Sequence, residues 1–108
     1  MMDKVLLSHE IFSQLRESFS ELSLVDLYLF GSIISHHNHV NDVDLLVVYE
    51  KESDLPVVKN VLHRIGWKMP LDITYMNREE ERELDFVKRQ GAVRVLETAD
   101  LSAACMLA

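Results

Sequence analysis

The segment "DVDLLVVY" at 42–49 constrains the fold more than any other part of the chain. Past its two acids, the residues that would point to either face of an extended strand are apolar, which is typical of a strand covered on both sides. Two other compact apolar runs, "VDLYLF" at 25–30 and "LDITYM" at 71–76, also have the length of buried strands. The chain is therefore predicted to form a sheet that other elements cover.

Helix signals lie before and after these strands. Hydrophobic residues recur at helical spacing through 8–22, and Ser8 is placed to cap the first turn. Segment 77–91 opens with Asn77 and Glu80, the pattern of a capping box, with acids in the first turn and bases in the last. Each segment is predicted to be one helix.

A further helix is predicted at 53–66. Ser53 or Asp54 can cap this helix, Pro56 suits its first turn, and Gly66 suits its end. Because it stands between the second and third strands, it is expected to connect them.

The predicted order is helix, strand, strand, helix, strand, helix, with 92–96 as a candidate last strand. This mixture indicates an α/β (α+β) fold, in which a small mixed sheet has helices packed against it. A chain of 108 residues is expected to form a single domain, 1–108. The tail, about 97–108, carries no assigned element in this prediction.

Charge and composition exclude several classes of function. A formal charge of −7 argues against broad nucleic-acid binding, because such binding needs a surface rich in Lys and Arg. No apolar stretch approaches the length of a membrane span. Cys105 is the single cysteine, so an internal disulfide is excluded, which suits a reducing compartment. A cytoplasmic protein without membrane contact is expected.

Three acids form a candidate cation site. Asp42 and Asp44 are two residues apart on a predicted strand, so their side chains share one face. Asp72 stands near the start of a later strand, on the face that also carries Thr74. If the two strands are neighbours, all three carboxylates converge. Such oxygen ligands suit Mg²⁺, and three carboxylates can hold two ions for a phosphoryl displacement.

The dipeptide Gly31-Ser32 is a candidate phosphate-binding turn. Gly31 ends an apolar strand, and a residue without a Cβ lets backbone approach a ligand closely. A short helix beginning at Ser32 would direct backbone amides and a hydroxyl toward a phosphate. Taken alone, this dipeptide is also common in ordinary turns.

Together, these motifs resemble the nucleotidyltransferase superfamily of DNA polymerase β, and above all its minimal nucleotidyltransferases, small stand-alone domains of about this length. The matching segments are "FGS" at 30–32, "DVDLLV" at 42–47 and "LDITY" at 71–75. The similarity in the order of elements extends to about Leu96. It implies the nucleotidyltransferase fold, which is similar to the polymerase β palm.

The resemblance implies a role for each candidate site residue. Gly31 and Ser32 would bind the triphosphate of the nucleotide, with ATP as the expected substrate. Asp42 and Asp44 would hold two Mg²⁺ ions, while Asp72 would help to hold one of them and activate the acceptor hydroxyl. The implied reaction transfers a nucleoside monophosphate to that hydroxyl and releases pyrophosphate.

The resemblance also implies partners. Many minimal nucleotidyltransferases pair with a helical HEPN protein that is an RNase toxin, and act as the antitoxin by adding AMP to it. A HEPN-type partner, with AMP transfer to a protein hydroxyl, is therefore expected; a homodimer is the other assembly considered. Nucleotidylation of a small molecule such as an aminoglycoside is a weaker alternative, because a chain of this size has no second domain to close a pocket.

The loop after Ser32 departs from the family pattern. It reads "IISHHNHVN", without the arginine that often follows the serine in these proteins. This leaves open a non-catalytic subunit that neutralises or scaffolds its partner by contact alone. His36, His37 and His39 lie in the loop, and a solvated loop is favoured for them over a transition-metal site or a phosphate contact. Trp67 and Tyr75 are interpreted as packing residues rather than as platforms for a base.

Overall fold

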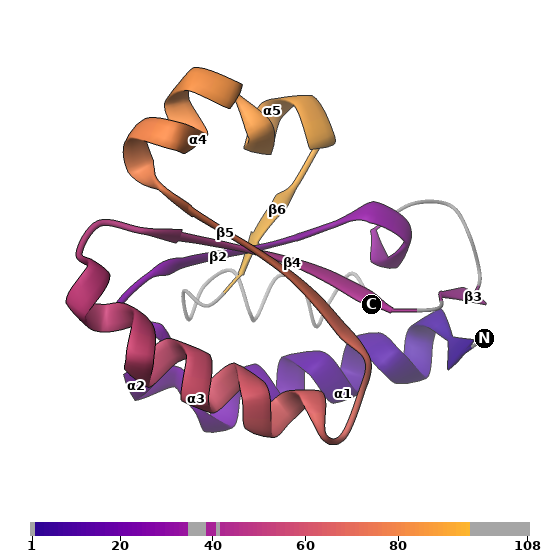
Figure 1. Cartoon of the computed structure of the whole chain (residues 1–108). Helices are drawn as coiled ribbons and strands as arrows, with labels where there is room; N and C mark the ends of the chain where they lie inside the picture. The colour runs from indigo at the N-terminus through magenta and orange to yellow at the C-terminus, as the bar shows by residue number, and fades with distance from the viewer. Residues whose placement is uncertain (1, 35–38, 41, 96–108) are drawn as a thin grey trace.

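The computed structural model describes residues 2–34, 39–40 and 42–95 (Figure 1). The predictions for His36, His37 and the tail from 97 therefore lie outside the described residues. In chain order, the elements are β1 (Met2–Asp3), α1 (Lys4–Glu17), α2 (Phe19–Leu22), β2 (Asp26–Phe30), η1 (Gly31–Ile33), β3 (His39–Val40), β4 (Val43–Tyr49), η2 (Glu52–Asp54), α3 (Leu55–Gly66), β5 (Leu71–Asn77), α4 (Arg78–Leu84), α5 (Phe86–Gln90) and β6 (Val93–Val95).

The main sheet has four strands in the order β5-β4-β2-β6. β4 and β5 are parallel, with α3 connecting them, whereas β2 is antiparallel to both β4 and β6. The two short strands β1 and β3 pair separately. The prediction of a mixed α/β fold is confirmed, and so are the three main strands and the candidate strand near the end of the described chain.

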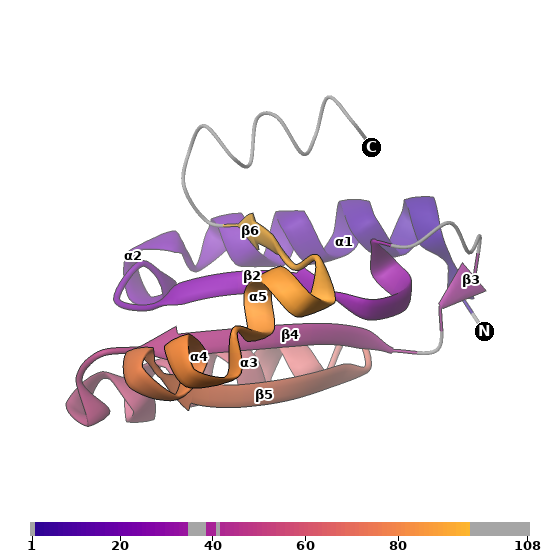
Figure 2. The same ribbon diagram turned by 90° about the horizontal axis from the view of Figure 1, so that it is seen from above.

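Helices cover the two faces of the sheet unequally. α1, α2 and α3 lie against one face, and α4 and α5 against the other (Figure 1). Viewed from above, α1 follows the β2 side of the sheet and α3 the β4–β5 side (Figure 2). Most of the buried side chains fill the first interface; Leu46, Val48 and Met76 form a smaller buried cluster under α5.

β4 is buried on both faces, as its sequence predicts. Leu45 and Val47 face the helices α1 and α3, while Leu46 and Val48 face α5. Leu45, Leu46 and Val47 have no solvent exposure. Burying one such side chain contributes about 1.5–3 kcal/mol, so this strand is the centre of the packing.

Two helix starts differ from the prediction. The prediction of one helix over 8–22 is wrong: the chain is helical from Lys4 and divides at Ser18 into α1 and α2, so Ser8 lies inside α1 rather than at its N-cap. α3 begins at Leu55 after the short turn η2, and the Asp54 side chain, at the N-cap position, makes no capping hydrogen bond. Pro56 is in the first turn of α3, as predicted, and Gly66 is its last residue.

The helix predicted at 77–91 is wrong in one respect, because it breaks at Asp85. That residue adopts the left-handed conformation, with φ of 51°, and separates α4 from α5. The Glu81 carboxylate then accepts a hydrogen bond from the Val87 amide at 3.2 Å, which satisfies one free amide of the second helix. The break turns Phe86 back onto the sheet, where it meets Phe30 edge-on at 5.0 Å.

The two ends of 77–91 match their prediction. The Asn77 side chain accepts from the Glu80 amide at 2.8 Å, and the Glu80 carboxylate accepts from the Asn77 amide at 3.0 Å. This reciprocal pair is the predicted capping box. Gly91 ends α5 with φ of 61°, a conformation that favours glycine.

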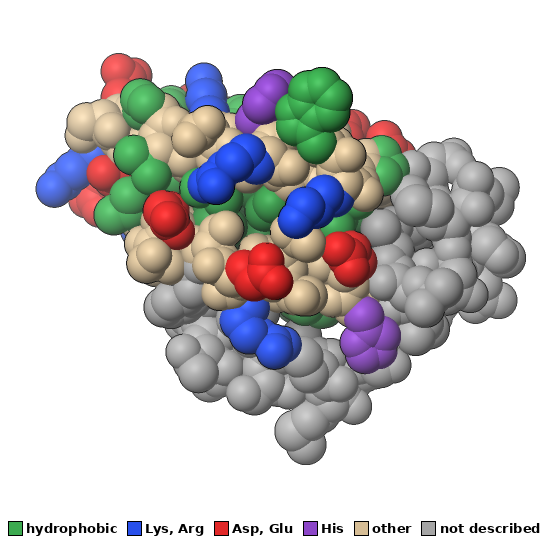
Figure 3. All heavy atoms as spheres, turned by 90° about the horizontal axis from the view of Figure 1, so that it is seen from below, with side chains coloured by type: hydrophobic (Ala, Val, Ile, Leu, Met, Phe, Trp, Pro, Cys, Tyr) green, Lys and Arg blue, Asp and Glu red, His purple; other side chains and the backbone are tan. Residues whose placement is uncertain are grey.

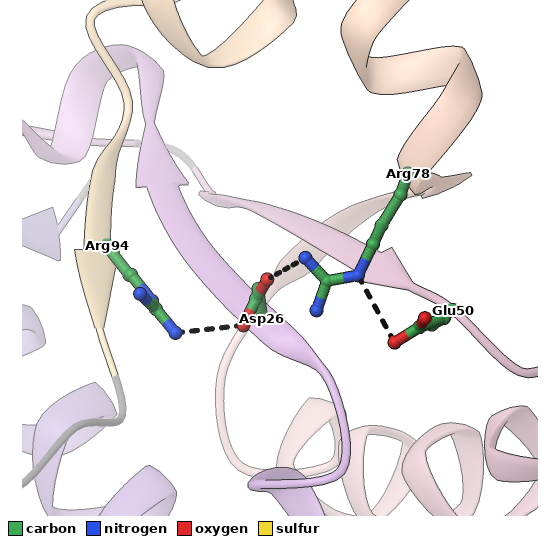
Figure 4. Close-up of polar contacts among 4 residues, drawn as sticks. All are labelled: Asp26, Glu50, Arg78 and Arg94. Atoms are coloured by element: carbon green, nitrogen blue, oxygen red, sulfur yellow. Dashed lines mark hydrogen bonds and ion pairs between the residues drawn. The ribbon is translucent and has the colours of Figure 1, made fainter.

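Asp26 joins three elements at the far end of the sheet from the candidate acids. It accepts from Arg94 of β6 at 2.9 Å and from Arg78 of α4 at 3.2 Å, and Arg78 also reaches Glu50 at 3.6 Å (Figure 4). Burial and then the Asp26 charge raise the pKa of Tyr28 nearby. Because both arginines are half-exposed, each pair contributes at most about 1 kcal/mol.

Within the described residues, no helix is long and apolar enough to cross a membrane.

Candidate functional site

The strand register brings two of the predicted acids together. In the parallel pair of β4 and β5, Asp44 is the direct partner of Asp72. Across the other edge of β4, Asp44 is the partner of Phe30 at the end of β2. Direct partners in neighbouring strands point to the same face. The condition on which convergence of the acids depended, that the third predicted strand lies beside the second, is therefore met.

These acids lie on the face that α5 only partly covers. Asp44 alternates along β4 with Leu45 and Val47, which face the larger core, so its side chain shares the opposite face with Leu46. Asp72 likewise alternates with Leu71 and Ile73, which pack against the larger core. The two acids lie one residue after the first residue of β4 and of β5, at the starts of both strands.

A backbone hydrogen bond holds the starts of β4 and β5 side by side. The Val43 amide donates to the Pro70 carbonyl at 2.9 Å, directly before each strand begins. Asp42 precedes Val43 in a bend and is half-buried, whereas Asp72 follows Pro70 by two residues and is exposed. The three carboxylates therefore come from two chain segments that a hydrogen bond holds side by side.

The electrostatics of Asp44 reflect this crowding. Burial raises the pKa of its carboxyl, and the charges of Asp42 and then Asp72 raise that pKa further. A side-chain hydrogen bond with Asp72 also favours the protonated form of Asp44. A hydrogen bond between two carboxyl groups needs a shared proton, because two carboxylates have only acceptors. The same position suits a cation, which would remove the repulsion without a proton.

Gly31 lies against the Asp44 side chain. Its φ is +74°, and a Cβ added there would overlap Asp44 Oδ2 and stand 3.0 Å from Cγ. Both the backbone conformation and the contact therefore require glycine at this position. The group that approaches the Gly31 backbone in the structure is the Asp44 carboxylate, and the predicted approach to a ligand phosphate stays a prediction.

The turn that follows is shorter than a full helix. η1 spans Gly31–Ile33, and the Ile34 amide donates to the Gly31 carbonyl at 3.2 Å. The short helix considered for this turn is a single 3₁₀ turn that begins at Gly31 rather than at Ser32. Ser32 is half-buried within it. Ser32 therefore follows directly after the residue that contacts Asp44.

The donor set fits one Mg²⁺ ion. Asp44 and Asp72 are direct cross-strand partners, and Mg²⁺ commonly takes one or two carboxylates and completes its shell with water and phosphate oxygens. Among the described residues, no group of three or more His, Cys, Asp or Glu side chains is arranged to hold a metal. The expected second ion thus stays a prediction, and it would need Asp42 to approach the other two acids.

An aromatic pair beside the acids was not anticipated. Phe30 is the cross-strand neighbour of Asp44, and Phe86 packs edge-on against its ring. The position of Phe30 directly before Gly31 placed it in the matching segment "FGS", but its sequence context gave no sign of Phe86. That contact depends on the break at Asp85, which sequence patterns did not indicate.

The remaining candidates lie elsewhere. His39 pairs through its backbone with Asp3 in the small β1–β3 sheet, and nothing described bears on a metal or phosphate role for the three loop histidines. Tyr75 packs against the larger core, and burial raises the pKa of its hydroxyl, so the packing prediction is confirmed. The packing prediction for Trp67 is wrong: its side chain is 81% exposed.

Comparisons of this chain with protein-family models, with curated proteins and with solved structures returned no match.

Proposed function

We propose that this protein is a minimal nucleotidyltransferase with the polymerase β-like nucleotidyltransferase fold. The observation that carries the proposal is the junction of Gly31, Asp44 and Asp72, in which a glycine turn lies against one acid and a parallel strand holds the second acid beside it. A metal-bound triphosphate needs both kinds of group close together: backbone that a phosphate can approach, and carboxylates that bind its cation.

The proposed reaction moves AMP from ATP to a protein hydroxyl and releases pyrophosphate. Asp42 and Asp44 would hold Mg²⁺, with Asp72 as a shared ligand. When bound, Mg²⁺ would neutralise phosphate charge and stabilise the attacking and leaving oxygens of an in-line displacement. The backbone of the Gly31 turn would bind the triphosphate, with the Ser32 hydroxyl as a further donor.

Asp72 is proposed to take the proton from the acceptor hydroxyl as that oxygen attacks the α-phosphorus. It is the most exposed of the three acids, and it lies on β5 at the edge of the sheet. An acceptor can therefore approach it from outside without displacing the Gly31 turn. The expected acceptor is a HEPN-type helical partner, in which case the protein acts as the antitoxin of a toxin–antitoxin pair.

The experiment that tests this activity is intact-mass spectrometry of the co-expressed partner after incubation with the protein, ATP and Mg²⁺. The expected result is a mass increase of one or more AMP units that is absent in Asp44→Asn and Asp72→Asn. Glu83→Gln, which changes an exposed carboxylate on α4, is the matched control and should retain full activity. Equal modification by the protein and Asp44→Asn would refute the assignment.

A non-catalytic binding subunit is the second candidate, and the composition of the turn favours it. Residues 31–34 read Gly-Ser-Ile-Ile, so no cationic side chain stands in the turn to meet a triphosphate. In that case Asp42→Ala/Asp44→Ala would inhibit the partner as well as the unaltered protein does. Complete dependence of inhibition on the two acids would instead exclude this candidate.

A further inference from the structure

Trp67 presents a large apolar surface to solvent. It directly follows α3, is 81% exposed, and is the only tryptophan of the chain. Its Nε1 donates to His63 Nε2 at 3.3 Å, and the two rings meet edge-on at 6.1 Å. The indole is therefore held against the helix although little else covers it. Fixed, exposed tryptophan is a common anchor of protein interfaces.

A pocket opens beside this ring. It has a volume of ≈ 230 Å³ and is lined by Leu62, His63, Gly66, Trp67, Leu71 and Ile73. A Cβ on Gly66 would meet nothing within 4 Å, so the mouth of the pocket is open at that point. Pockets that take whole small molecules are usually about 300–1,000 Å³. This smaller, mostly apolar hollow suits a single large side chain.

The strand side of the pocket belongs to an open sheet edge. β5 is hydrogen-bonded to β4, and among the described strands it has no neighbour on its other side. An edge strand offers a row of backbone donors and acceptors to an incoming strand. Natural edges are commonly protected by Lys, Pro or a bulge. The seven residues 71–77, "LDITYMN", contain neither Lys nor Pro.

The same surface continues along α3 and includes a positively charged side chain, Lys59. Lys59, His63 and Trp67 follow at intervals of four residues, so they lie on one side of the helix. Lys59 Nζ stands 5.1 Å from the centre of the Tyr75 ring on β5. Among the described residues, no carboxylate pairs with Lys59. Figure 3, seen from the side of α1 and α3, shows Lys and Arg side chains spread over this face among its acids.

We propose that the outer edge of β5 and the adjoining side of α3 bind an extended segment of a partner protein. The segment adds a strand to β5, places an apolar side chain in the Trp67 pocket, and places a carboxylate at Lys59. Backbone hydrogen bonds supply affinity in this mode of recognition, and the pockets for alternate side chains supply specificity. The docking itself does not depend on nucleotidyl transfer.

The spacing of the two subsites defines the segment. A residue opposite Ile73 would enter the pocket, and a residue opposite Tyr75 would face Lys59. These positions are two residues apart, about 6.8 Å along a strand. The residue between them would point to the opposite face, beside Asp72 and Thr74. If the proposed function holds, that intervening position is where an acceptor hydroxyl would be presented.

The test uses the full chain and a short peptide with blocked ends. The peptide has threonine at every second position, a leucine at its centre, and a glutamate two positions before and two positions after the leucine. Either strand direction then brings a carboxylate to Lys59. Because Trp67 is the only tryptophan, its emission reports on the pocket directly. The expected result is a saturable blue shift, with amide exchange of the outward-facing β5 amides slowed at least severalfold at saturation.

Reversing the charge at position 59 distinguishes this docking from non-specific peptide binding. Lys59→Glu should weaken binding of the glutamate peptide at least tenfold and should strengthen binding of the same peptide with lysines in place of glutamates. Lys88→Glu, an exposed change on α5, is the matched control and should leave both affinities unchanged. A peptide with proline beside the leucine, which removes a backbone donor, should not bind.

Three results would overturn the proposal. One is the absence of any change in Trp67 emission and β5 exchange at millimolar peptide. Another is equal binding of the glutamate and lysine peptides by both the protein and Lys59→Glu. A third is a concentration-dependent blue shift without peptide, accompanied in sedimentation by a dimer that Trp67→Ser abolishes. That would assign the edge to a second copy of the chain. None of these results bears on AMP transfer, which the mass experiment measures separately.

Discussion

Gly31 shows how one residue can join backbone conformation to chemistry. Its φ of +74° and its contact with the Asp44 carboxylate each exclude a side chain, and they do so for different reasons. The sequence alone predicted neither; it predicted a close approach of this backbone to a ligand, because glycine has no Cβ. The second depends on the pairing of Phe30 with Asp44, a register that no local pattern reveals. The presence of a glycine and an aspartate indicated the kind of site, and the register of β2 with β4 determined how close the two residues lie.

Replacing Gly31 should be costly both for stability and for the site. In Gly31→Ala, the left-handed conformation alone should lower the free energy of unfolding by about 1–3 kcal/mol. The overlap with Asp44 Oδ2 adds to that loss. Gly66→Ala is the matched control: its Cβ meets nothing, and alanine within a helix should be neutral or stabilising by up to about 1 kcal/mol. Urea denaturation measures both changes, and equal effects would contradict the close approach.

The raised pKa of Asp44 predicts a pH dependence of stability. Folding raises the pKa of this carboxyl above its ordinary value of 3.8, so the folded state holds the proton more tightly than the unfolded state. The resulting contribution to stability is fully present below about pH 3.8 and is lost as pH rises through the folded pKa. At neutral pH, the ionised carboxylate therefore lowers the stability of the folded protein.

Asp44→Asn should accordingly be more stable than the unaltered protein at pH 7, and the difference should shrink as pH falls toward 4. The asparagine amide can still donate a hydrogen bond to Asp72, so the change mainly removes the charge. Chemical denaturation at a series of pH values measures the effect. A difference that is independent of pH, or that grows on acidification, would contradict the crowding of carboxylates at this site.

At the scale of elements, the helix termini followed their sequence signals only where a side chain could reach the backbone. Asn77 and Glu80 form the predicted capping box because they stand at the exit of β5 with their side chains free to turn back. Ser8 does not cap, since the chain is already helical from Lys4. The break at Asp85 was missed because the apolar contact of Phe86 with the sheet outweighs the helix propensity of the surrounding charged residues.

The capping box offers a direct test at this scale. Asn77→Ala removes the side-chain acceptor for the Glu80 amide and should destabilise the protein by about 1 kcal/mol. Asp54→Ala is the matched control, because that residue occupies the N-cap position of α3 without a side-chain capping bond. Its effect should be smaller than that of Asn77→Ala. Equal losses in thermal denaturation would show that the box does not stabilise α4.

At the scale of the whole molecule, sequence patterns predicted a small mixed sheet with helices packed against it and a strand at 42–49 that is covered on both faces. They could not predict the strand order, because it depends on long-range pairing between strands whose apolar surfaces are similar. They also did not predict the exposure of Trp67: an indole is apolar enough to suggest burial, and only its position after the last turn of α3 leaves it outside. The pairing of Asp44 with Asp72 follows from this strand order together with the register of β4 and β5.

The unequal cores predict unequal local stability. Leu46, Val48 and Met76 are the buried residues under α5, whereas the opposite face buries side chains from α1, α2, α3 and the strands β2, β4 and β6. In native-state hydrogen exchange, α4 and α5 should therefore open at a lower free energy than α3, since fewer apolar contacts must be lost. Exchange of both regions at the same free energy would indicate a single cooperative unit instead.

The central claim is that Asp44, Asp72 and the Gly31 turn together bind a metal-bound nucleotide. The most direct test is the melting temperature of the protein in the presence of Mg²⁺ and a non-hydrolysable ATP analogue. A ligand that binds only the folded state adds about 2.7 kcal/mol to the free energy of unfolding at a concentration of 100 times Kd. The melting temperature should therefore rise. The rise should require both Mg²⁺ and nucleotide, and should vanish in Asp44→Asn and Asp72→Asn but persist in Glu83→Gln. An equal rise in all four proteins, or none in the unaltered protein at millimolar ligand, would contradict the account.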